Sequence, residues 1–402
     1  MKLKTIRNID YCLGVILCFI FTLINDLSCL FMRSRKKSFP VECVLFVKLS
    51  ELGSIILSHP LIKKVKTKYP SARIMFLTFK ENSEILDILE IASKENTVVL
   101  RNDSFIVFSF DLLKAVLRLR RENIDLLFDL EMFSRVSALI GYIIKPKKGV
   151  GFYNYAYEGL YRGDFLTNKV LYNPLLHISK SFFALNFAAK AEFKNTPEVE
   201  EKIDDNDLSI PKVVFLDSEI EKFIRKFKLD SFIKNEKMIL LSLGDGNIPL
   251  REWPLDYFVG IANKFIAKNV KIGLVGGKGA VKKANLFVNT IKPNECFNFT
   301  GLTTTKDLLM LFNIANLLIT NDSGMAHLAS LTSIRKIVFF GQESPQVFSP
   351  LDNNTEIFYS GLLCSPCFSV LNHRQSKCRD NKCLKAISPE MVYASAAKII
   401  NI

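Results

Sequence analysis

The sequence predicts an α/β protein with two doubly wound, mostly parallel sheets, one in each half of the chain. Three observations support this fold class. Short apolar runs alternate with amphipathic helical stretches in both halves, several apolar runs end in glycine, and a charged segment separates the halves. A chain of 402 residues is also too long for one ordinary domain and suits two of roughly 150 to 200 residues.

The first half alternates apolar strands with helices. We expect strands at 41–49, 72–79, 96–100 and 124–130, and helices at 53–70, 82–92 and 109–123. Because β-α-β alternation uses crossover connections, these strands should pair in parallel. This half is expected to form one domain over residues 39–200, which ends in a charged stretch with little apolar pattern.

The second half repeats the pattern after a linker at 201–210. We expect strands at 237–244, 270–277, 317–320 and 335–341, and helices at 255–269, 279–291 and 305–315. This domain should cover residues 211–386, followed by a C-terminal helix at 387–402. Since ligands of open α/β sheets gather beyond the carboxyl ends of strands, the glycine turns at those ends are candidate binding positions.

Residues 10–32 form an almost continuously apolar segment near the N-terminus. About 22 helical residues reach roughly 33 Å, enough to cross a bilayer, but Asn25, Asp26 and Ser28 interrupt the second half. A helix lying in the membrane interface therefore competes with a spanning one, and a buried helix of a soluble fold is a third interpretation. We expect residues 1–38 to be a retained anchor, because no cleavage site follows.

The flanks of this segment carry basic residues on both sides. The positive-inside rule then favours a cytoplasmic C-terminal side only slightly. The flanking residues are Lys2, Lys4, Arg7, Arg33, Arg35, Lys36 and Lys37.

The composition favours an anionic partner. With 54 Lys+Arg against 40 Asp+Glu the chain carries a formal charge of +14. Zinc-finger spacing and RNA-binding aromatic signatures are absent from the sequence, so nucleic acid is not expected. An anionic membrane surface fits the charge and the apolar segment together.

The stretch "TNDSGMAHLAS" (320–330) places Asp322, Ser323, Gly324 and His327 between a predicted strand and a helix-like run. The backbone N–H groups of Ser323, Gly324 and Met325 would start that helix and could receive an anion. A plain helix cap by Asp322 or Ser323 is the simpler interpretation, and the two are compatible.

At this point the chain resembles glycosyltransferase family 9, which contains the ADP-heptose:lipopolysaccharide heptosyltransferases. The resemblance covers roughly residues 41–400, and its most specific part is a D-[ST]-G-x-x-H turn after a T-G-x-[TS] segment. The matching stretches are "VLFVKLSELGSIILSHPLIKKVKTKYPSARIMFLT", "LSLGDGNIPLREWPLDYF", "KIGLVGG" and "NFTGLTTTKDLLMLFNIANLLITNDSGMAHLAS".

The resemblance implies a GT-B fold, in which two Rossmann-like domains face each other across a cleft and the second holds the nucleotide sugar. It implies an inverting glycosyltransferase that moves heptose from ADP-heptose to a lipopolysaccharide-type acceptor at the cytoplasmic face of the bacterial inner membrane. It also implies a substrate-binding set whose members in the turn are Asp322, Ser323, Gly324, Met325 and His327. The other members are Lys48, Gly53, Ser54, Gly244, Gly276, Gly277, Thr300 and Gly301.

Two expected catalytic residues follow from comparing the motifs. Arg251 stands where the family has a lysine before Trp-Pro, and would neutralise charge on the diphosphate leaving group unless it is a plain surface arginine. The family's Gly-Asp aspartate, which resembles the general base, is replaced by Ser54, whose hydroxyl has no useful basicity. We hypothesise that Glu51 supplies the base; the alternative is a solvated loop residue.

A second departure concerns the nucleotide. The family often has a glutamate after the "VGG" glycines, and residues 275–285 contain none. The nucleotide base is therefore not fixed by the sequence. The two departures motivate an alternative function, a catalytically weakened nucleotide-sugar-binding protein that assists a partner transferase. A sugar-nucleotide epimerase of the same architecture is a third option, which the 322–327 turn disfavours.

Four cysteines cluster near the C-terminus in "CSPCFSVLNHRQSKCRDNKC". Two close pairs joined by a short loop suit a tetrahedral thiolate site for structural zinc. Reduced thiols or disulfides are the alternatives, and no cofactor is expected for catalysis. The candidate ligands are Cys364, Cys367, Cys378 and Cys383.

Overall fold

The computed structural model describes residues 3–31, 39–153, 160–190, 202–230, 232, 236–246 and 248–402. The chain divides into two compact units, Met1–Leu208 and Ser209–Ile402, each of which is described here by itself. The basic residues at 33–37 and most of the charged stretch before the expected linker lie outside the described residues.

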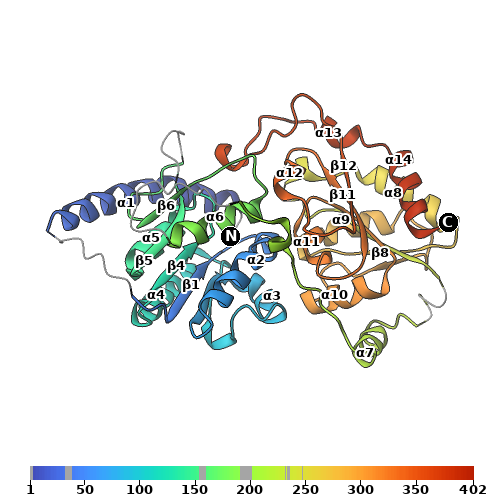
Figure 1. The fold of residues 1–402 in the computed structure, drawn as a ribbon. Coiled ribbons are helices and arrows are strands. Elements are labelled where there is room, and N and C mark those ends of the chain that lie inside the picture. Colours follow the sequence, from blue (N-terminus) through green and yellow to red (C-terminus); the bar gives the residue numbers. More distant parts are fainter. Residues whose placement is uncertain are drawn as a thin grey trace. The chain divides into compact units, whose positions relative to one another are not determined.

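The first unit is built on a six-stranded parallel sheet (Figure 1). Its strand order is β3-β2-β1-β4-β5-β6. The strands are β1 (Cys43–Val47), β2 (Arg73–Phe79), β3 (Thr97–Leu100), β4 (Leu126–Asp129), β5 (Lys148–Tyr153) and β6 (Asn168–Leu171). The helices are α1 (Leu3–Phe31), α2 (Leu52–Lys68), α3 (Ser83–Ile88), α4 (Phe105–Arg121), α5 (Arg135–Ile144) and α6 (Ile178–Lys190).

Two helix layers cover this sheet. On one side α2 packs against α6. On the other side α4 and α5 bury Leu119 and Ile140 against Leu45 and Met75 of the central strands. The helix α1 lies outside this second layer, against α5. Among the described residues, α1 is the one helix with a stretch, Asp10–Ser28, long and apolar enough to cross a membrane by length and composition.

The second unit repeats the architecture with the order β12-β11-β10-β7-β8-β9, again parallel. The strands are β7 (Met238–Ser242), β8 (Lys271–Leu274), β9 (Cys296–Asn298), β10 (Leu317–Asn321), β11 (Arg335–Phe340) and β12 (Thr355–Tyr359). The helices are α7 (Asp217–Phe227), α8 (Leu255–Ile266), α9 (Val281–Val288), α10 (Thr305–Ile314), α11 (Gly324–Ala329), α12 (Pro345–Phe348), α13 (Lys382–Lys385) and α14 (Pro389–Ile400).

The strand order places a topological switch at the centre of each sheet. The chain leaves β1 toward β2 and returns on its other side at β4, and it leaves β7 toward β8 and returns at β10. Ligands of such sheets bind beyond the carboxyl ends of the strands at the switch. The loops after β1 and β4, and those after β7 and β10, are therefore where sites are expected.

The α/β class with two doubly wound sheets is confirmed, and several helix limits are corrected. The helix expected at 82–92 ends at Ile88, because the chain leaves the helix at Leu89 and takes positive φ at Glu90. The helix expected at 109–123 begins earlier, at Phe105, where the Ser104 hydroxyl accepts from the N–H of Val107. Elements between 131 and 236, including α5, β5, β6 and α6, were not predicted.

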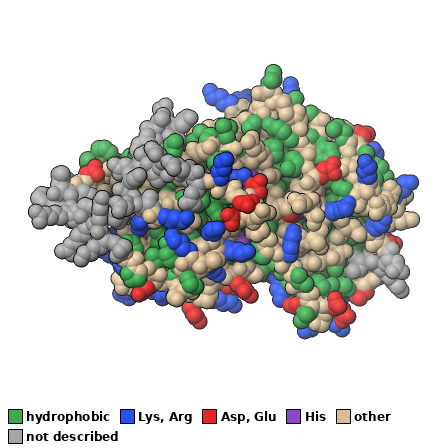
Figure 2. All heavy atoms as spheres, in the orientation of Figure 1, with side chains coloured by type: hydrophobic (Ala, Val, Ile, Leu, Met, Phe, Trp, Pro, Cys, Tyr) green, Lys and Arg blue, Asp and Glu red, His purple; other side chains and the backbone are tan. Residues whose placement is uncertain are grey.

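Basic side chains are spread over the surface of both units on the face drawn in Figure 2. This distribution agrees with the formal charge of +14 and does not by itself select one anionic partner.

Candidate functional site

The stretch after β10 forms a strand-to-helix turn at the carboxyl edge of the second sheet. Ser323 occupies the N-cap position of α11 with extended backbone and no side-chain capping hydrogen bond. The first N–H groups of a helix have no acceptor within it. Gly324 is exposed, whereas Asp322 and His327 are buried. The start of α11 is therefore accessible to solvent at Gly324, and the Ser323 side chain does not cap the helix.

Two further predicted residues adjoin each other after β8 and β9. The N–H of Gly301 donates to the carbonyl of Gly276 at 2.9 Å. A Cβ on Gly276 would lie 2.8 Å from Ala280 Cβ, whereas one on Gly277 would meet nothing within 4 Å. Thr300 is buried, with its hydroxyl 2.6 Å from the side-chain oxygen of Asn298. These residues form a turn at the carboxyl edge of the second sheet that is tightly packed at Gly276 and open at Gly277.

The segment that carries Arg251 is attached to the end of β10. The backbone N–H of Trp253 donates to the side-chain oxygen of Asn321 at 2.8 Å, and its indole N–H donates to the carbonyl of Ile387 at 2.9 Å. The indole is 2% exposed and stacks on Phe339 with ring centroids 4.6 Å apart. Arg251 is thus held near the β10–α11 turn by a buried tryptophan.

Arg251 shares a buried carboxylate with a second arginine. One of its terminal nitrogens lies 2.6 Å from Glu343 Oε1, and Nε of Arg374 lies 3.3 Å from the same oxygen. With the Gln342 amide oriented to satisfy its neighbours, its oxygen accepts from Arg251 Nε at 3.2 Å. Glu343 is 1% exposed, and Arg251 is partly exposed. Two guanidinium groups on one carboxylate leave a net positive charge, which suits a phosphate group.

Gly244, at the end of β7, lies against Glu252. Its φ is +91°, and a Cβ there would lie 2.4 Å from Glu252 Oε1. The same carboxylate accepts from the N–H of Gly246 at 2.7 Å and from Lys283. This glutamate, next to Arg251 in the chain, therefore fixes the loop after β7.

In the first unit, Lys48, Glu51 and Ser54 form a polar cluster at the carboxyl end of β1. The Ser54 hydroxyl donates to Glu51 Oε2 at 3.0 Å, and Lys48 Nζ lies 3.6 Å from the same oxygen. Glu51 has φ +70°, an uncommon conformation for this residue type that occurs often at functional sites. Its side chain is 39% exposed, while Lys48 and the adjacent Gly53 are buried.

A second glutamate in this cluster was not predicted. Glu131, which follows β4, accepts from Lys48 Nζ at 3.0 Å and from the backbone N–H groups of Leu49 at 2.7 Å and Ser50 at 3.1 Å. These three hydrogen bonds occupy both carboxylate oxygens of Glu131. Glu131 therefore holds the loop, and Glu51 is the more accessible carboxylate.

Comparison with known proteins identifies the family. The profile of glycosyltransferase family 9 (heptosyltransferase) matches residues 113–377, more than half of the chain. The chain belongs to glycosyltransferase family 9. Membership of this family confirms the GT-B fold and the glycosyltransferase activity that the motifs predicted.

Three similar proteins are consistent with this assignment. A lipooligosaccharide heptosyltransferase 2 of Campylobacter jejuni serotype O:2 is 24% identical over 87% of this chain and 95% of that protein. The serotype O:6 protein of the same name is 29% identical over 48% of this chain and 61% of its own length. The structure of E. coli ADP-heptose lipopolysaccharide heptosyltransferase II has a TM-score of 0.69 at 18% identity, and the match covers 89% of this chain and 98% of that one.

The four-cysteine tail of this family 9 chain holds no preformed ion site in the part of the chain that is described. No group of three or more His, Cys, Asp or Glu side chains there could hold a metal ion. Cys364 and Cys378 are exposed, Cys367 is half-buried and Cys383 is buried. Burial raises the pKa of the Cys383 thiol. Structural zinc stays a prediction from the spacing.

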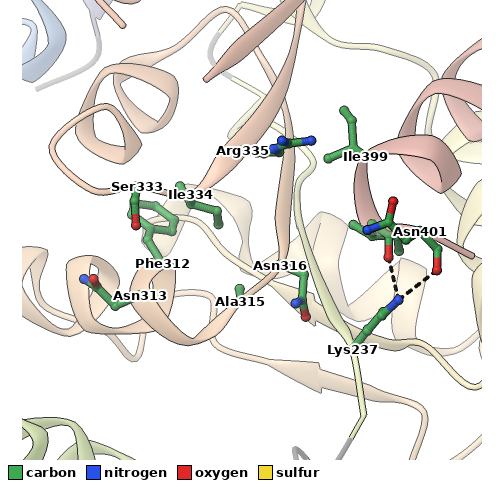
Figure 3. Close-up of a pocket in the computed structure, with 11 residues that line it drawn as sticks. Lys237, Phe312, Asn313, Ala315, Asn316, Ser333, Ile334, Arg335, Ile399 and Asn401 are labelled. Atoms are coloured by element: carbon green, nitrogen blue, oxygen red, sulfur yellow. Dashed lines mark hydrogen bonds between the residues drawn. The ribbon is translucent and has the colours of Figure 1, made fainter. Parts of the chain in front are cut away.

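A cavity of ≈ 380 Å³ lies at the opposite edge of the second sheet (Figure 3). Its lining includes Lys237, Asn316 and Arg335, which precede or begin β7, β10 and β11. Lys237 Nζ donates to the carbonyls of Ile400 at 2.5 Å and Asn401 at 2.9 Å, as Figure 3 shows. This lysine interacts favourably with the carboxyl end of the α14 dipole. Because the cavity lies at the amino ends of the strands, it is separate from the predicted donor residues, which follow the carboxyl ends.

The sequence did not reveal Glu131, Asn321, Glu252 and Glu343 as parts of the site. Each of them ends or follows a strand, or is adjacent in the chain to a predicted residue. Their positions near the carboxyl ends of strands could therefore have identified them as candidates. Their partners are far apart in the chain: Glu343 is 92 residues from Arg251, and Glu131 is 83 from Lys48. Those pairings depend on the strand order, which the sequence pattern does not give.

We predict different effects of alanine at the two adjacent glycines 276 and 277. Gly276→Ala should lower the free energy of unfolding by about 1–3 kcal/mol, because the added Cβ collides with Ala280. Gly277→Ala, the matched control, should stay within about 0.5 kcal/mol. Urea unfolding of both variants measures this; equal stabilities would contradict the described turn.

Proposed function

We propose that this glycosyltransferase transfers heptose, with inversion, from ADP-heptose to a lipopolysaccharide- or lipooligosaccharide-type acceptor. Family membership supports sugar transfer, and the names of the similar proteins support the donor and acceptor class. The observation that carries the proposal is the second unit's carboxyl edge, where the 322–327 turn and the cation of Arg251 are attached to one strand end.

The donor diphosphate would be received by backbone donors and by Arg251. The N–H groups of Ser323, Gly324 and Met325 suit phosphate oxygens, and Gly324 allows close approach of the backbone. Arg251, held by Glu343, would stabilise the negative charge that develops on the diphosphate as the bond to the sugar breaks. The leaving group is then the nucleoside diphosphate.

Glu51 would accept the proton of the attacking acceptor hydroxyl as its oxygen bonds to the sugar carbon. The carboxylate is exposed enough to meet a substrate, and two partners, Ser54 and Lys48, orient it. Ser54 occupies the family's aspartate position, so the carboxylate is supplied from three residues earlier. If Glu51 does not act as the base, the presence of Ser54 at the family's aspartate position favours the alternative function, a nucleotide-sugar-binding protein without turnover.

We also propose attachment to the cytoplasmic face of the bacterial inner membrane. The apolar stretch of α1 and the formal charge of +14 support binding to an anionic surface. The attached enzyme would then reach a membrane-embedded lipid acceptor without dissociating from the membrane surface.

Replacing Glu51 by glutamine tests the base. Glu51→Gln should lower kcat by about 10²–10⁴-fold, because the amide does not accept the proton. Ser54→Ala should lower kcat by a smaller factor, since it removes one of the groups that orient the carboxylate. Glu42→Gln, an exposed position just before the opposite end of β1, is the control and should retain full activity.

The measurement is single-turnover transfer from ADP-heptose to a truncated lipopolysaccharide acceptor. Near-normal turnover by Glu51→Gln would remove this residue as the base. Wild-type protein that binds ADP-heptose tightly but never transfers or hydrolyses it would support the binding-protein alternative.

Substitutions in the 322–327 turn test the donor site. Gly324→Val should abolish ADP binding with little loss of fold, because its side chain occupies the path to the backbone donors. His327→Ala should weaken binding by about 1.5–3 kcal/mol, the range for a hydrogen bond to a charged group. Ser323→Ala should change stability by less than about 0.5 kcal/mol, because its hydroxyl makes no capping bond.

Calorimetric titration with ADP, run beside thermal melts of the same variants, separates these effects. Unchanged ADP affinity in both Gly324→Val and His327→Ala would contradict a phosphate site at the turn. A stability loss in Ser323→Ala with unchanged affinity would restore the capping interpretation.

A further inference from the structure

The helix α1 has its polar side facing the protein. Small and polar residues recur every three or four positions along the side that packs on the first unit, and they are buried or half-buried. This stripe consists of Asp10, Gly14, Cys18, Thr22 and Asn25. A helix on a water-facing surface shows the opposite pattern, with apolar residues inward.

The start of the stripe is bound to the first turn of α5. The Asp10 carboxylate accepts from the backbone N–H groups of Arg135 at 3.0 Å and Val136 at 3.1 Å, and lies 3.2 Å from a guanidinium nitrogen of Arg135. Asp10 therefore acts as a cap for α5 from a distant part of the chain. Gly14 allows the close approach, because a Cβ there would lie 2.8 Å from Arg135 Cβ.

The end of the stripe is bound to residues 161–164. The Thr22 hydroxyl lies 2.9 Å from the Tyr161 hydroxyl and accepts from the N–H of Asp164 at 2.9 Å. The Asn25 side chain donates to the carbonyl of Asp164 at 3.3 Å. From Asp10 to Asn25 the helix thus runs alongside the first unit for about 22 Å.

The opposite side of α1 is apolar and exposed. Its large side chains are 41–59% exposed, and they include Leu13, Ile16, Phe19, Ile20, Leu23 and Leu27. Only 11% of the Asp10–Ser28 stretch is buried. A continuous apolar face of this length is a binding surface for lipid or protein.

A second exposed apolar stripe lies on α4. Ile106, Phe110, Leu113 and Leu117 follow helical spacing and are 80%, 64%, 60% and 51% exposed. The inner side of α4 already packs on the core through Ala115 and Leu119, so the outer stripe has no structural role there. Exposed basic residues accompany it in Lys114, Arg118, Arg120 and Arg121.

The helix α5 joins these two surfaces. It packs against α1 on one side and α4 on the other, and none of its residues is fully exposed. The helices α1 and α4 therefore both flank α5, and each carries exposed apolar residues. Basic groups beside apolar residues suit a bilayer with anionic headgroups.

We propose that the outer surface of α1 and α4 is a single membrane-binding face, and that α1 lies in the plane of the membrane. A spanning α1 would carry its bonded partners, including Asp164 with Lys169, to the depth of the hydrocarbon. If α1 lies in the plane of the membrane, these charged groups stay on the side of the helix that faces the protein, outside the hydrocarbon. The inference deepens the proposed membrane attachment and makes the acceptor-side unit the one that contacts lipid.

Single tryptophans measure depth directly. Leu13→Trp, Ile20→Trp and Leu27→Trp sample α1 over its length, Leu113→Trp and Phe110→Trp sample α4, and Leu286→Trp on α9 is the control at 54% exposure. The full-length protein is bound to phosphatidylethanolamine–phosphatidylglycerol vesicles that carry brominated acyl chains at defined depths. The native Trp253 is buried and its signal is subtracted as the wild-type background.

If α1 lies in the plane of the membrane, its three tryptophans are at equal depth. We therefore expect shallow bromines to quench them to within about twofold of one another. The same lipids should also quench the α4 tryptophans. Leu286→Trp should show no quenching. Deep quenching confined to Ile20→Trp would show a spanning helix and overturn the in-plane arrangement, while membrane attachment itself would stand. Unquenched α4 tryptophans, together with a wild-type protein that is dimeric in solution and a Leu113→Ser variant that is monomeric, would assign that stripe to a second copy and overturn the single face.

Discussion

The hydrogen bond from the Trp253 backbone to the Asn321 side chain holds together the parts of the second unit that matter for donor binding. Asn321 ends β10, directly before the turn with Ser323 and Gly324, and its amide nitrogen lies 3.4 Å from the carbonyl of Ser242 at the end of β7. The tryptophan it holds is buried against Phe339. Because Asn321 binds the backbone of the buried Trp253, it also fixes the position of the neighbouring segment that carries Arg251.

The first unit uses a related device with a different residue type. Glu131 follows β4, the strand beside β1, and its carboxylate accepts from two backbone N–H groups and the ammonium of Lys48 in the loop after β1. That loop leads directly to Glu51, whose side chain remains accessible. In both units a side chain from the returning central strand therefore fixes a loop that carries a proposed catalytic group, Glu51 or Arg251.

The fold class and the edges of the sheets could be predicted because buried parallel strands are short apolar runs with glycine turns at their ends. The positions of Gly276 and Ser323 at one edge follow from that pattern, whereas Gly301 was named only by the family motif, because the short strand β9 before it was not predicted. The ion pairs could not be predicted, because strand order decides which distant residues meet. The polar stripe of α1 has a spacing of three or four residues from Asp10 to Asn25, but hydropathy alone does not say which side of an apolar helix faces the protein.

The most direct test of the central claim is a double-mutant cycle on ADP affinity, measured by calorimetry for Arg251→Ala, Asn321→Ala and the double variant. If the Asn321–Trp253 bond positions Arg251 for the diphosphate, the loss from Arg251→Ala should shrink by at least about 1 kcal/mol when Asn321 is already alanine. Losses that add within about 0.3–0.5 kcal/mol would show that the two residues act independently and would contradict this account.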